Sequence, residues 1–402
     1  MDLNRESLDV LMLIGRNGPI ARRTIGRTLG FNSSRVTRLT DRLLKSGLIH
    51  ESGQEGSMGG RPSILLDLAE ANHLLAGVLV SYSSTVQVVL MDLGANLLEE
   101  EMLRLTPDTG ADDLIGQISA ALNGCLARRS PLSGRLLGAG VGVSGLVDPA
   151  AGTIHNSPGF PSCRAVNLGA KLSQLLAIPV YLENEVALST LAEMWYGRGK
   201  GHSNFLYFNM GPGVRMGIVI GGALFRGDTG NAGEVGHITV DRSGPFCYCG
   251  NTGCLESVVS GDEFLATARE SLDPRSTSIL ADSWRAGGDT LGVSRIFEAA
   301  REGDQFARNL LRRFCRPIGT TLANMVNIFD IGKIVIGGTF AEAGDALLEI
   351  LRDEIELRSL PVPGRTVSIE VAAFGGTSTA IGGGALVLQK ICSGDAPLSF
   401  LE

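Results

Sequence analysis

The sequence contains no apolar run long enough to cross a bilayer, and its first residues, MDLNRESLDVLML, lack the basic segment and apolar core of an export signal. The apolar stretch LLAGVLV at 74–80 has the length of a buried strand. Low-complexity segments and short-period repeats are also missing. We therefore expect a cytoplasmic protein without a membrane partner.

Cysteine and charge are both sparse. Seven cysteines in a cytosolic chain of this size do not indicate a disulfide framework, and three of them fall within 247–254. Charged residues make up 19% of the chain and hydrophobic residues 44%, which is typical of a globular protein with a sizeable core. With 402 residues, two or three domains are expected.

The few charges are unevenly placed along the chain. Residues 1–62 hold ten Lys and Arg and six Asp and Glu, a net charge of +4. The remaining residues hold 25 and 36, a net charge of −11, so that the whole chain carries −7. A basic head on an acidic body indicates that the head binds a polyanion.

The head has the pattern of a winged helix-turn-helix. Helices are predicted over 5–16, 21–29 and from Asn32, a favourable N-cap, to Lys45. Two strands, 48–51 and 64–68, flank the glycine-rich stretch SGQEGSMGGRPS. The third helix buries Val36, Leu39, Leu43 and Leu44 and leaves a polar face outward.

That outward face has the chemistry of a recognition helix. Hydroxyl and guanidinium groups near the start of a helix can contact base edges and phosphates in the major groove, and an arginine fixed by a following proline can enter the minor groove. The alternative is a basic three-helix module that binds protein. The wing and the charge segregation favour DNA, and the predicted contacts are Ser33, Ser34, Arg35, Thr37, Arg38, Arg42 and, in the wing, Arg61.

The body, after about residue 70, alternates strands with helices, which predicts α/β layers. Predicted strands are 74–80, 86–93, 136–143, 178–183, 204–210, 217–221, 333–337 and 366–374. Predicted helices are 111–129, 167–177, 186–196, 255–269, 304–327, 341–355 and 377–391.

The strongest local motif predicts a structural zinc site. Cys247, Cys249 and Cys254 lie within eight residues among glycines, and His237 lies ten residues upstream. Three thiolates and an imidazole form a closed Cys₃His set for one tetrahedral zinc ion. The alternative is a group of unpaired buried thiols in a glycine-rich loop.

These motifs resemble those of the ROK family of repressors and sugar kinases. The family signature is Gly-His followed by CxCGxxGCxE, as at 236–237 and 247–256. The stretches GVSGLVDP (142–149), ENEVA (183–187) and Ile336-Gly337-Gly338 resemble further family segments. The winged head is what the family's repressor branch carries, including xylose and N-acetylglucosamine repressors.

The resemblance implies a winged helix-turn-helix domain at 1–70 and a two-lobed, actin/hexokinase-like α/β domain at 71–402, with a cleft between the lobes. The small lobe would span about 71–185 plus the C-terminal helix, and the large lobe about 186–375. The family's sugar contacts map onto Gly145, Ser157, Asn184, Glu185, Glu234, His237 and Glu256. Carboxylate, amide and imidazole groups suit sugar hydroxyls, which both donate and accept hydrogen bonds.

The segments that would serve phosphoryl transfer depart from the family pattern. The first phosphate loop, DxGxT, has Leu79 in place of aspartate and Ser81-Tyr82 in place of the glycine region. The second phosphate loop, GTGxG, reads Gly211-Pro212-Gly213-Val214-Arg215. The family's END segment is Glu-Asn-Glu at 183–185, so that Glu185 replaces the aspartate base and its carboxylate lies one methylene further out. Proline lacks the N–H that would bind a phosphate, and the arginine side chain adds bulk where the phosphates would lie. Arg215 could instead bind the phosphate of a sugar phosphate. We therefore expect a sensor of a sugar or sugar phosphate and not an enzyme.

Two alternatives remain open beside a sugar-responsive regulator, most simply a repressor. One is a bifunctional sugar kinase with a DNA-binding head, and the other is a regulator controlled by a protein partner. Because a palindromic operator is read by two heads, a homodimer or tetramer is expected.

Overall fold

The computed structural model describes residues 3–55, 63–70, 72–129, 134–285 and 291–396. It divides the chain into two compact units, residues 1–202 with 376–402 and residues 203–375. No helix within the described ranges is long and apolar enough to cross a membrane.

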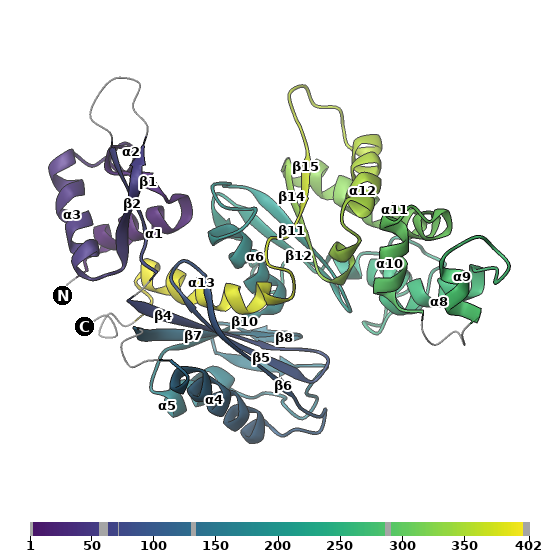
Figure 1. The fold of residues 1–402 in the computed structure, drawn as a ribbon, viewed down its shortest axis with the longest axis horizontal. Helices are drawn as coiled ribbons and strands as arrows, with labels where there is room; N and C mark the ends of the chain where they lie inside the picture. Colours follow the sequence, from purple (N-terminus) through teal and green to yellow (C-terminus); the bar gives the residue numbers. More distant parts are fainter. Residues whose placement is uncertain (1–2, 56–62, 71, 130–133, 286–290, 397–402) are drawn as a thin grey trace. The chain divides into compact units, whose positions relative to one another are not determined.

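The head consists of three helices and a small antiparallel sheet (Figure 1). The helices are α1 (Arg5–Asn17), α2 (Arg22–Leu29) and α3 (Ser33–Lys45), and the sheet has the order β1 (Ile20–Ala21), β3 (Ser63–Leu68), β2 (Ile49–Glu55). Asn32 caps α3 as predicted, because its side chain accepts the Arg35 N–H at 2.9 Å. Val36, Leu39 and Leu43 are buried, while the predicted core residue Leu44 is only half-buried.

The α/β part of the first unit is one five-stranded sheet with helices on both faces. Its order is β10 (Val180–Asn184), β7 (Arg135–Val143), β4 (His73–Val80), β5 (Thr85–Asp92), β6 (Leu97–Arg104). Figure 1 shows α13 (Ser378–Ser393) along one face of this sheet and α4 (Ala111–Ala127) and α5 (Leu168–Leu176) along the other. On the α13 side the sheet and helix backbones nearly touch, since a Cβ on Gly77 would lie 1.7 Å from the Ala380 carbonyl oxygen.

Helix α6 (Glu185–Trp195) packs beside α13 and begins directly at the end of strand β10. The Asn184 side chain caps it by accepting the Val186 N–H at 2.9 Å. A short hairpin, β8 (Leu146–Asp148) with β9 (Thr153–Asn156), follows β7. The carboxyl ends of β7 and β10 therefore place 144–145 and 184–185 together.

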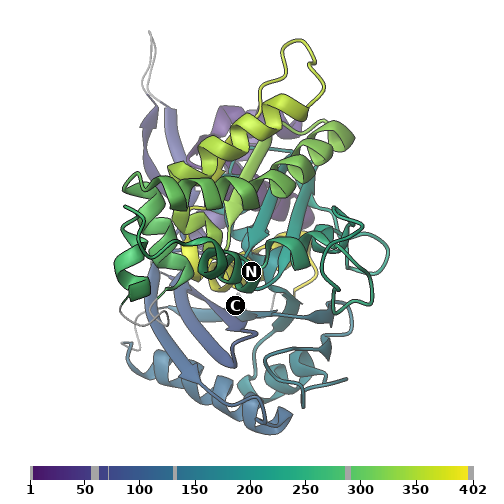
Figure 2. The ribbon, with the colours of Figure 1, turned by 90° about the vertical axis from the view of Figure 1, so that its right-hand side faces the viewer.

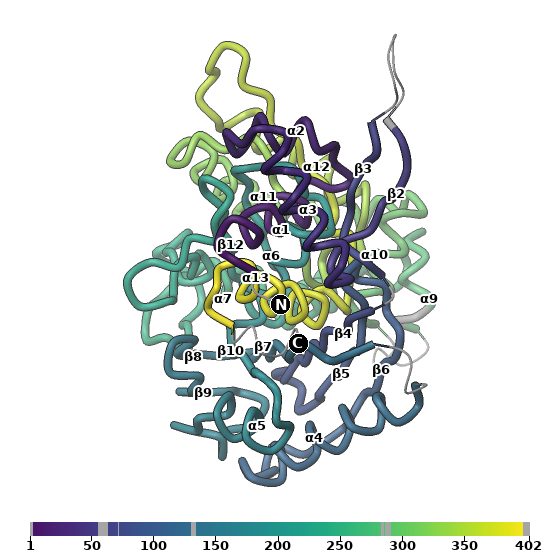
Figure 3. The backbone as a smooth tube through the Cα atoms, turned by 90° about the vertical axis from the view of Figure 1, so that its left-hand side faces the viewer, coloured from purple at the N-terminus to yellow at the C-terminus, as the bar shows by residue number. Residues whose placement is uncertain are grey.

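The head is joined to this unit through α1, which packs on α13 and α6 (Figure 3). The Arg16 guanidinium lies 5.8 Å from the centroid of the Trp195 ring. A Cβ on Gly15 would lie 2.4 Å from a carbon of the same ring, so only glycine fits between the two helices without a shift. The last residue of α6 thus contacts the first helix of the head.

The second unit is built on a sheet in the order β13 (Ala223–Leu224), β12 (Val214–Ile220), β11 (Phe205–Met210), β14 (Lys333–Gly337), β15 (Ser368–Val371). Six α-helices are described in it: α7 (Leu255–Val259), α8 (Gly261–Ser271), α9 (Leu280–Arg285), α10 (Val293–Arg301), α11 (Gln305–Phe329) and α12 (Asp345–Arg358). Figure 2 shows α11 and α12 as two long green helices side by side. The core includes the edge-to-face pairs of Phe264 with Phe314 and Phe340.

Several elements differ from the sequence predictions. The helix predicted over 255–269 is two helices, because Ser260 begins a new one by accepting the Glu263 N–H at 3.1 Å. The strand predicted at 366–374 covers only Ser368–Val371. Strand β6 and helices α9 and α10 were not predicted; β6 carries three consecutive glutamates, which are uncommon in strands, and lies at a sheet edge.

Candidate functional site

The predicted recognition surface lies on α3. Ser33, Ser34, Arg35, Thr37 and Arg38 are exposed, and Arg42 is half-buried. A concavity of about 550 Å³ runs along this face and is lined by Ser33, Ser34, Thr37, Arg38, Asp41, Arg42 and Lys45. Lys45, which follows Arg42 by three residues, was not predicted. The predicted wing contact Arg61 lies outside the described residues.

Arg35 differs from the other polar residues of α3 because its guanidinium already has partners inside the head. Its Nε donates to the Glu6 carboxylate at 3.0 Å, a second guanidinium N–H donates to the other oxygen, and the group lies 4.7 Å from the Phe31 ring centroid. The hydrogen bond from Arg35 lowers the pKa of Glu6. Arg38 makes no ion pair in the described part of the chain.

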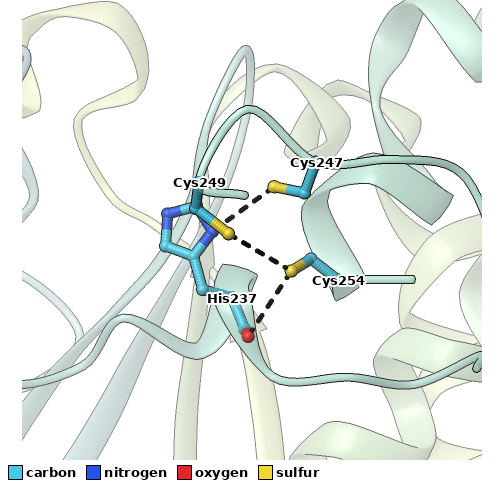
Figure 4. Close-up of side chains that lie close together, drawn as sticks. All are labelled: His237, Cys247, Cys249 and Cys254. Carbon is cyan, nitrogen blue, oxygen red and sulfur yellow. Dashed lines mark hydrogen bonds between the residues drawn. The ribbon is translucent and has the colours of Figure 1, made fainter. Parts of the chain in front are cut away.

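The four predicted metal ligands converge (Figure 4). Their ligand atoms all lie within 4.8 Å of one another. The Cys247 Sγ lies 3.7 Å from the His237 Nδ1, and the Cys249 and Cys254 sulfurs are 3.7 Å apart. A tetrahedral ion with metal–sulfur bonds of about 2.3 Å places its sulfur ligands about 3.8 Å apart, so the cluster has the dimensions of a zinc site.

The backbone around the cluster explains how four ligands separated by up to 17 residues meet. His237 ends the short 3-10 helix Val235–His237, and Cys254 is the residue before α7. Cys254 pairs with Thr239 in an isolated bridge, which brings the two segments together. Between them Gly253 has a φ of +69°, and a Cβ there would lie 1.4 Å from the Asp241 carbonyl oxygen.

The thiols differ in their surroundings. Burial raises the pKa of the Cys254 thiol to about 12, whereas the Asn251 backbone N–H lowers the pKa of the exposed Cys249. All seven cysteines are free thiols. Three sulfurs and one imidazole nitrogen, with no carboxylate among them, are the soft donor set that zinc accepts.

Four predicted sugar contacts lie together in the first unit. Asn184 donates from its side-chain amide to the Gly145 carbonyl at 3.1 Å, and the Ser144 hydroxyl donates to the Glu185 carboxylate. Gly145 has a φ of +138°, and a Cβ there would lie 2.1 Å from the Asn156 carbonyl oxygen. Ser157 is fully buried, and its hydroxyl has no hydrogen-bond partner among the described residues.

The other three predicted contacts, Glu234, His237 and Glu256, lie in the second unit around the metal cluster. Glu234 forms an ion pair with Arg215 at 2.8 Å. Glu256 is buried in the first turn of α7, and its Oε2 accepts the Val214 N–H at 2.7 Å. The ion pair was not expected from the sequence, since the two residues are 19 positions apart and no local pattern links them.

The loop that replaces the family's second phosphate loop has few N–H groups left for a phosphate. Gly211 donates its N–H to the Gly213 carbonyl at 3.1 Å, Pro212 has none, and the N–H of Val214 is taken by Glu256. In the first loop, the Ser81 and Ser83 hydroxyls hydrogen-bond each other at 3.2 Å. In both loops, N–H or hydroxyl groups that could bind a phosphate are therefore hydrogen-bonded within the chain.

Tyr248, between two of the cysteines, was missed by the sequence analysis. Its hydroxyl lies 3.2 Å from the His237 Nε2, and its ring meets the imidazole edge-on at a centroid distance of 5.3 Å. Burial of the hydroxyl together with the Glu256 charge raises the pKa of Tyr248. The residue thus contacts His237, which is both a predicted metal ligand and a predicted sugar contact.

Comparison with known proteins gives the family. Residues 83–390 match the model of the ROK family, and residues 1–56 match that of the MarR family. The chain is 30% identical over 384 residues to the xylose repressor of Caldicellulosiruptor bescii, covering 96% of this chain and 95% of that protein. It is 32% identical over 308 residues to the glucokinase of Halalkalibacterium halodurans, covering 76% of this chain and 93% of that enzyme.

A solved structure has the same fold throughout. It is described as a ROK family transcriptional regulator, a homolog of the E. coli Mlc protein, and it matches with a TM-score of 0.82 and 24% identity over 99% of both chains. The predicted fold class is thereby confirmed. The chain belongs to the ROK family, and a winged helix-turn-helix head precedes its family domain.

Proposed function

We propose that this protein is a sugar-responsive transcriptional repressor whose head binds operator DNA and whose ROK domain binds the effector without phosphorylating it. The observation that carries the proposal is the exposed Ser, Thr and Arg face of α3, on a head that precedes a match to the ROK family over residues 83–390. The likeness to the xylose repressor over 96% of the chain supports it. A homodimer or tetramer would present two heads to a palindromic operator.

We infer that the effector, a sugar or sugar phosphate, is bound by Gly145, Ser157, Asn184, Glu185, Glu234, His237 and Glu256. The buried Ser157 hydroxyl supports this, because an unsatisfied buried polar group costs about 1–3 kcal/mol and a ligand hydroxyl would satisfy it. Arg215, paired with Glu234, is the cation available to a phosphorylated effector. We also propose that the DNA-binding head and the effector-binding domain meet near residue 70.

We propose one structural zinc ion per chain, held by His237, Cys247, Cys249 and Cys254. The ion would fix the start of α7, and with it Glu256, relative to the 3-10 helix that carries His237. Its role is structural because four protein ligands leave no open coordination position.

The absence of catalysis is proposed from the two phosphate loops. Leu79 stands where a carboxylate would meet the metal, and the loop at 211–214 offers few donors. Because the chain is also similar to a glucokinase, phosphorylation of sugars by the purified protein is measured directly.

The experiment has two arms on the full-length protein. A duplex selected from a random-sequence DNA library should bind with an affinity that falls steeply with salt, and binding should be lost when residues 1–62 are deleted. Xylose, glucose and N-acetylglucosamine, each free and phosphorylated, are then screened by thermal shift, because a ligand that binds only the folded state raises its stability.

Three results would each contradict a part of the proposal. If the protein still binds DNA without residues 1–62, the head is not its DNA-binding domain. ATP-dependent phosphorylation of any of these sugars, abolished by Glu185→Ala, would show that the protein is a kinase. If no sugar binds and a partner protein is found to control DNA binding, the result favours a repressor that is regulated by a protein.

A further inference from the structure

Tyr248 makes an unusual contact for a residue on an exposed loop. The residue is 79% exposed, yet its hydroxyl meets the His237 Nε2 at 3.2 Å. His237 is a predicted effector contact. Phe246, two residues earlier on the same loop, is 74% exposed and has no hydroxyl to make such contacts.

The direction of this hydrogen bond follows from the proposed zinc site. The His237 Nδ1 faces the Cys247 sulfur at 3.7 Å, so it is the ring nitrogen that would hold the ion, and a metal-binding nitrogen carries no proton. The neutral imidazole then has its proton on Nε2, which donates to the phenol oxygen.

The phenol therefore occupies the position of a ligand hydroxyl. A sugar hydroxyl can also accept from His237 Nε2–H, so it can replace the phenol without changing the hydrogen bond that His237 donates. Tyr248 is able to leave, because most of its side chain is in solvent and its ring contacts the imidazole only at an edge.

We propose that Tyr248 is an affinity-determining residue that covers His237 in the free protein and is displaced by one hydroxyl of the effector. This inference rests on the proposed function, since it assumes that His237 binds a sugar. It predicts that the protein binds its effector less tightly than a variant without the phenol hydroxyl does, because the effector must first break the hydrogen bond between Tyr248 and His237.

The test compares the parent, Tyr248→Phe and the control Phe246→Leu, all zinc-loaded and full-length. Tyr248→Phe keeps the ring against His237 and removes only the hydroxyl. Calorimetry is done with xylose, glucose, N-acetylglucosamine and their phosphates. The sugar that binds the parent should bind Tyr248→Phe about three- to tenfold more tightly, because this is the factor that one net hydrogen bond contributes to affinity. Phe246→Leu should bind as the parent does.

A second measurement needs no sugar. The chain has five histidines, so the Nε2–H of His237 can be assigned by nitrogen-15 NMR. Its exchange with water should be faster in Tyr248→Phe than in the parent, while metal analysis gives equal zinc in both. Unchanged exchange would show that the phenol does not cover His237 and would overturn the inference.

The sugar results separate two failures. If a sugar binds the parent but binds Tyr248→Phe equally or more weakly, the phenol either has no effect or contacts the sugar, and the inference is wrong while the proposed effector site stands. If no sugar binds any of the three proteins, the sugar-binding part of the proposed function is wrong, and the inference fails with it.

Discussion

Arg35 and Arg38 are close neighbours on α3, but their surroundings give them different expected roles. Arg35 is held by Glu6 and Phe31, whereas Arg38 lines the exposed concavity. We expect Arg38→Ala to weaken DNA binding by about 1–3 kcal/mol if it contacts a base, with a loss that depends on the DNA sequence. Fluorescence anisotropy on the selected duplex and on a scrambled duplex, at several salt concentrations, measures this.

Arg35→Ala serves as the comparison. It should lower the stability of the head more than Arg38→Ala does and change DNA affinity less. If Arg35→Ala weakens DNA binding more than Arg38→Ala does, the contact between Arg35 and Glu6 must open on DNA binding, and Arg35 contacts the bases.

The Glu6–Arg35 pair also predicts a pH dependence. Because Arg35 lowers the pKa of Glu6 in the folded head, the pair stabilises the fold at pH values above the ordinary glutamate value of 4.5, and this contribution is lost as the pH falls through the lower, folded pKa. Denaturant unfolding of the parent and Glu6→Gln should therefore differ at neutral pH and converge at acid pH. A constant difference at all pH values would contradict the assignment.

At the scale of secondary-structure elements, α7 depends on the metal cluster. It is a five-residue helix preceded by Cys254, and its Glu256 reaches the Val214 N–H. A helix this short is not stable by itself, so the loop that begins it must be fixed from outside.

We expect Cys249→Ser to lose zinc, to lower the melting temperature and to weaken effector binding, since Glu256 is no longer held. Metal analysis and calorimetry of the variant measure the two effects. Cys125→Ala, at a buried cysteine of the first unit, is the control and should retain zinc. A freshly purified parent protein without zinc would contradict the metal assignment at once.

At the scale of the whole molecule, α6 links a predicted effector segment to the head. Its first residue is Glu185, and its last, Trp195, contacts Gly15 of α1. Any effect of the sugar on DNA affinity must equal the effect of DNA on sugar affinity, so a variant at this contact can be tested from either side.

We expect Gly15→Ala to reduce the change in DNA affinity that the sugar causes, because its methyl group would lie 2.4 Å from the Trp195 ring and force α1 and α6 apart. Gly116→Ala in α4, where nothing lies within 4 Å, is a matched control and should keep the full response. DNA affinities with and without sugar give the result, and an undiminished response in Gly15→Ala would exclude this contact from the coupling.

Local patterns in the sequence were sufficient to predict helix α3 and the ligands of the metal cluster. The polar Asn32 before an amphipathic segment predicted α3, and the spacing of three cysteines predicted the metal cluster, because capping and short-loop chelation involve residues close in the chain. The fold class followed from the alternation of strands and helices together with the ROK motifs.

The tertiary structure alone decided the partners of the charged and polar groups. Arg35 meets Glu6, Arg215 meets Glu234, and Val214 gives its N–H to Glu256 across separations of 29, 19 and 42 residues. No local pattern encodes such pairs, since they form only when packing of the core brings distant segments together. For the same reason, the sequence could place Tyr248 between two metal ligands but could not show that its hydroxyl contacts the His237 Nε2.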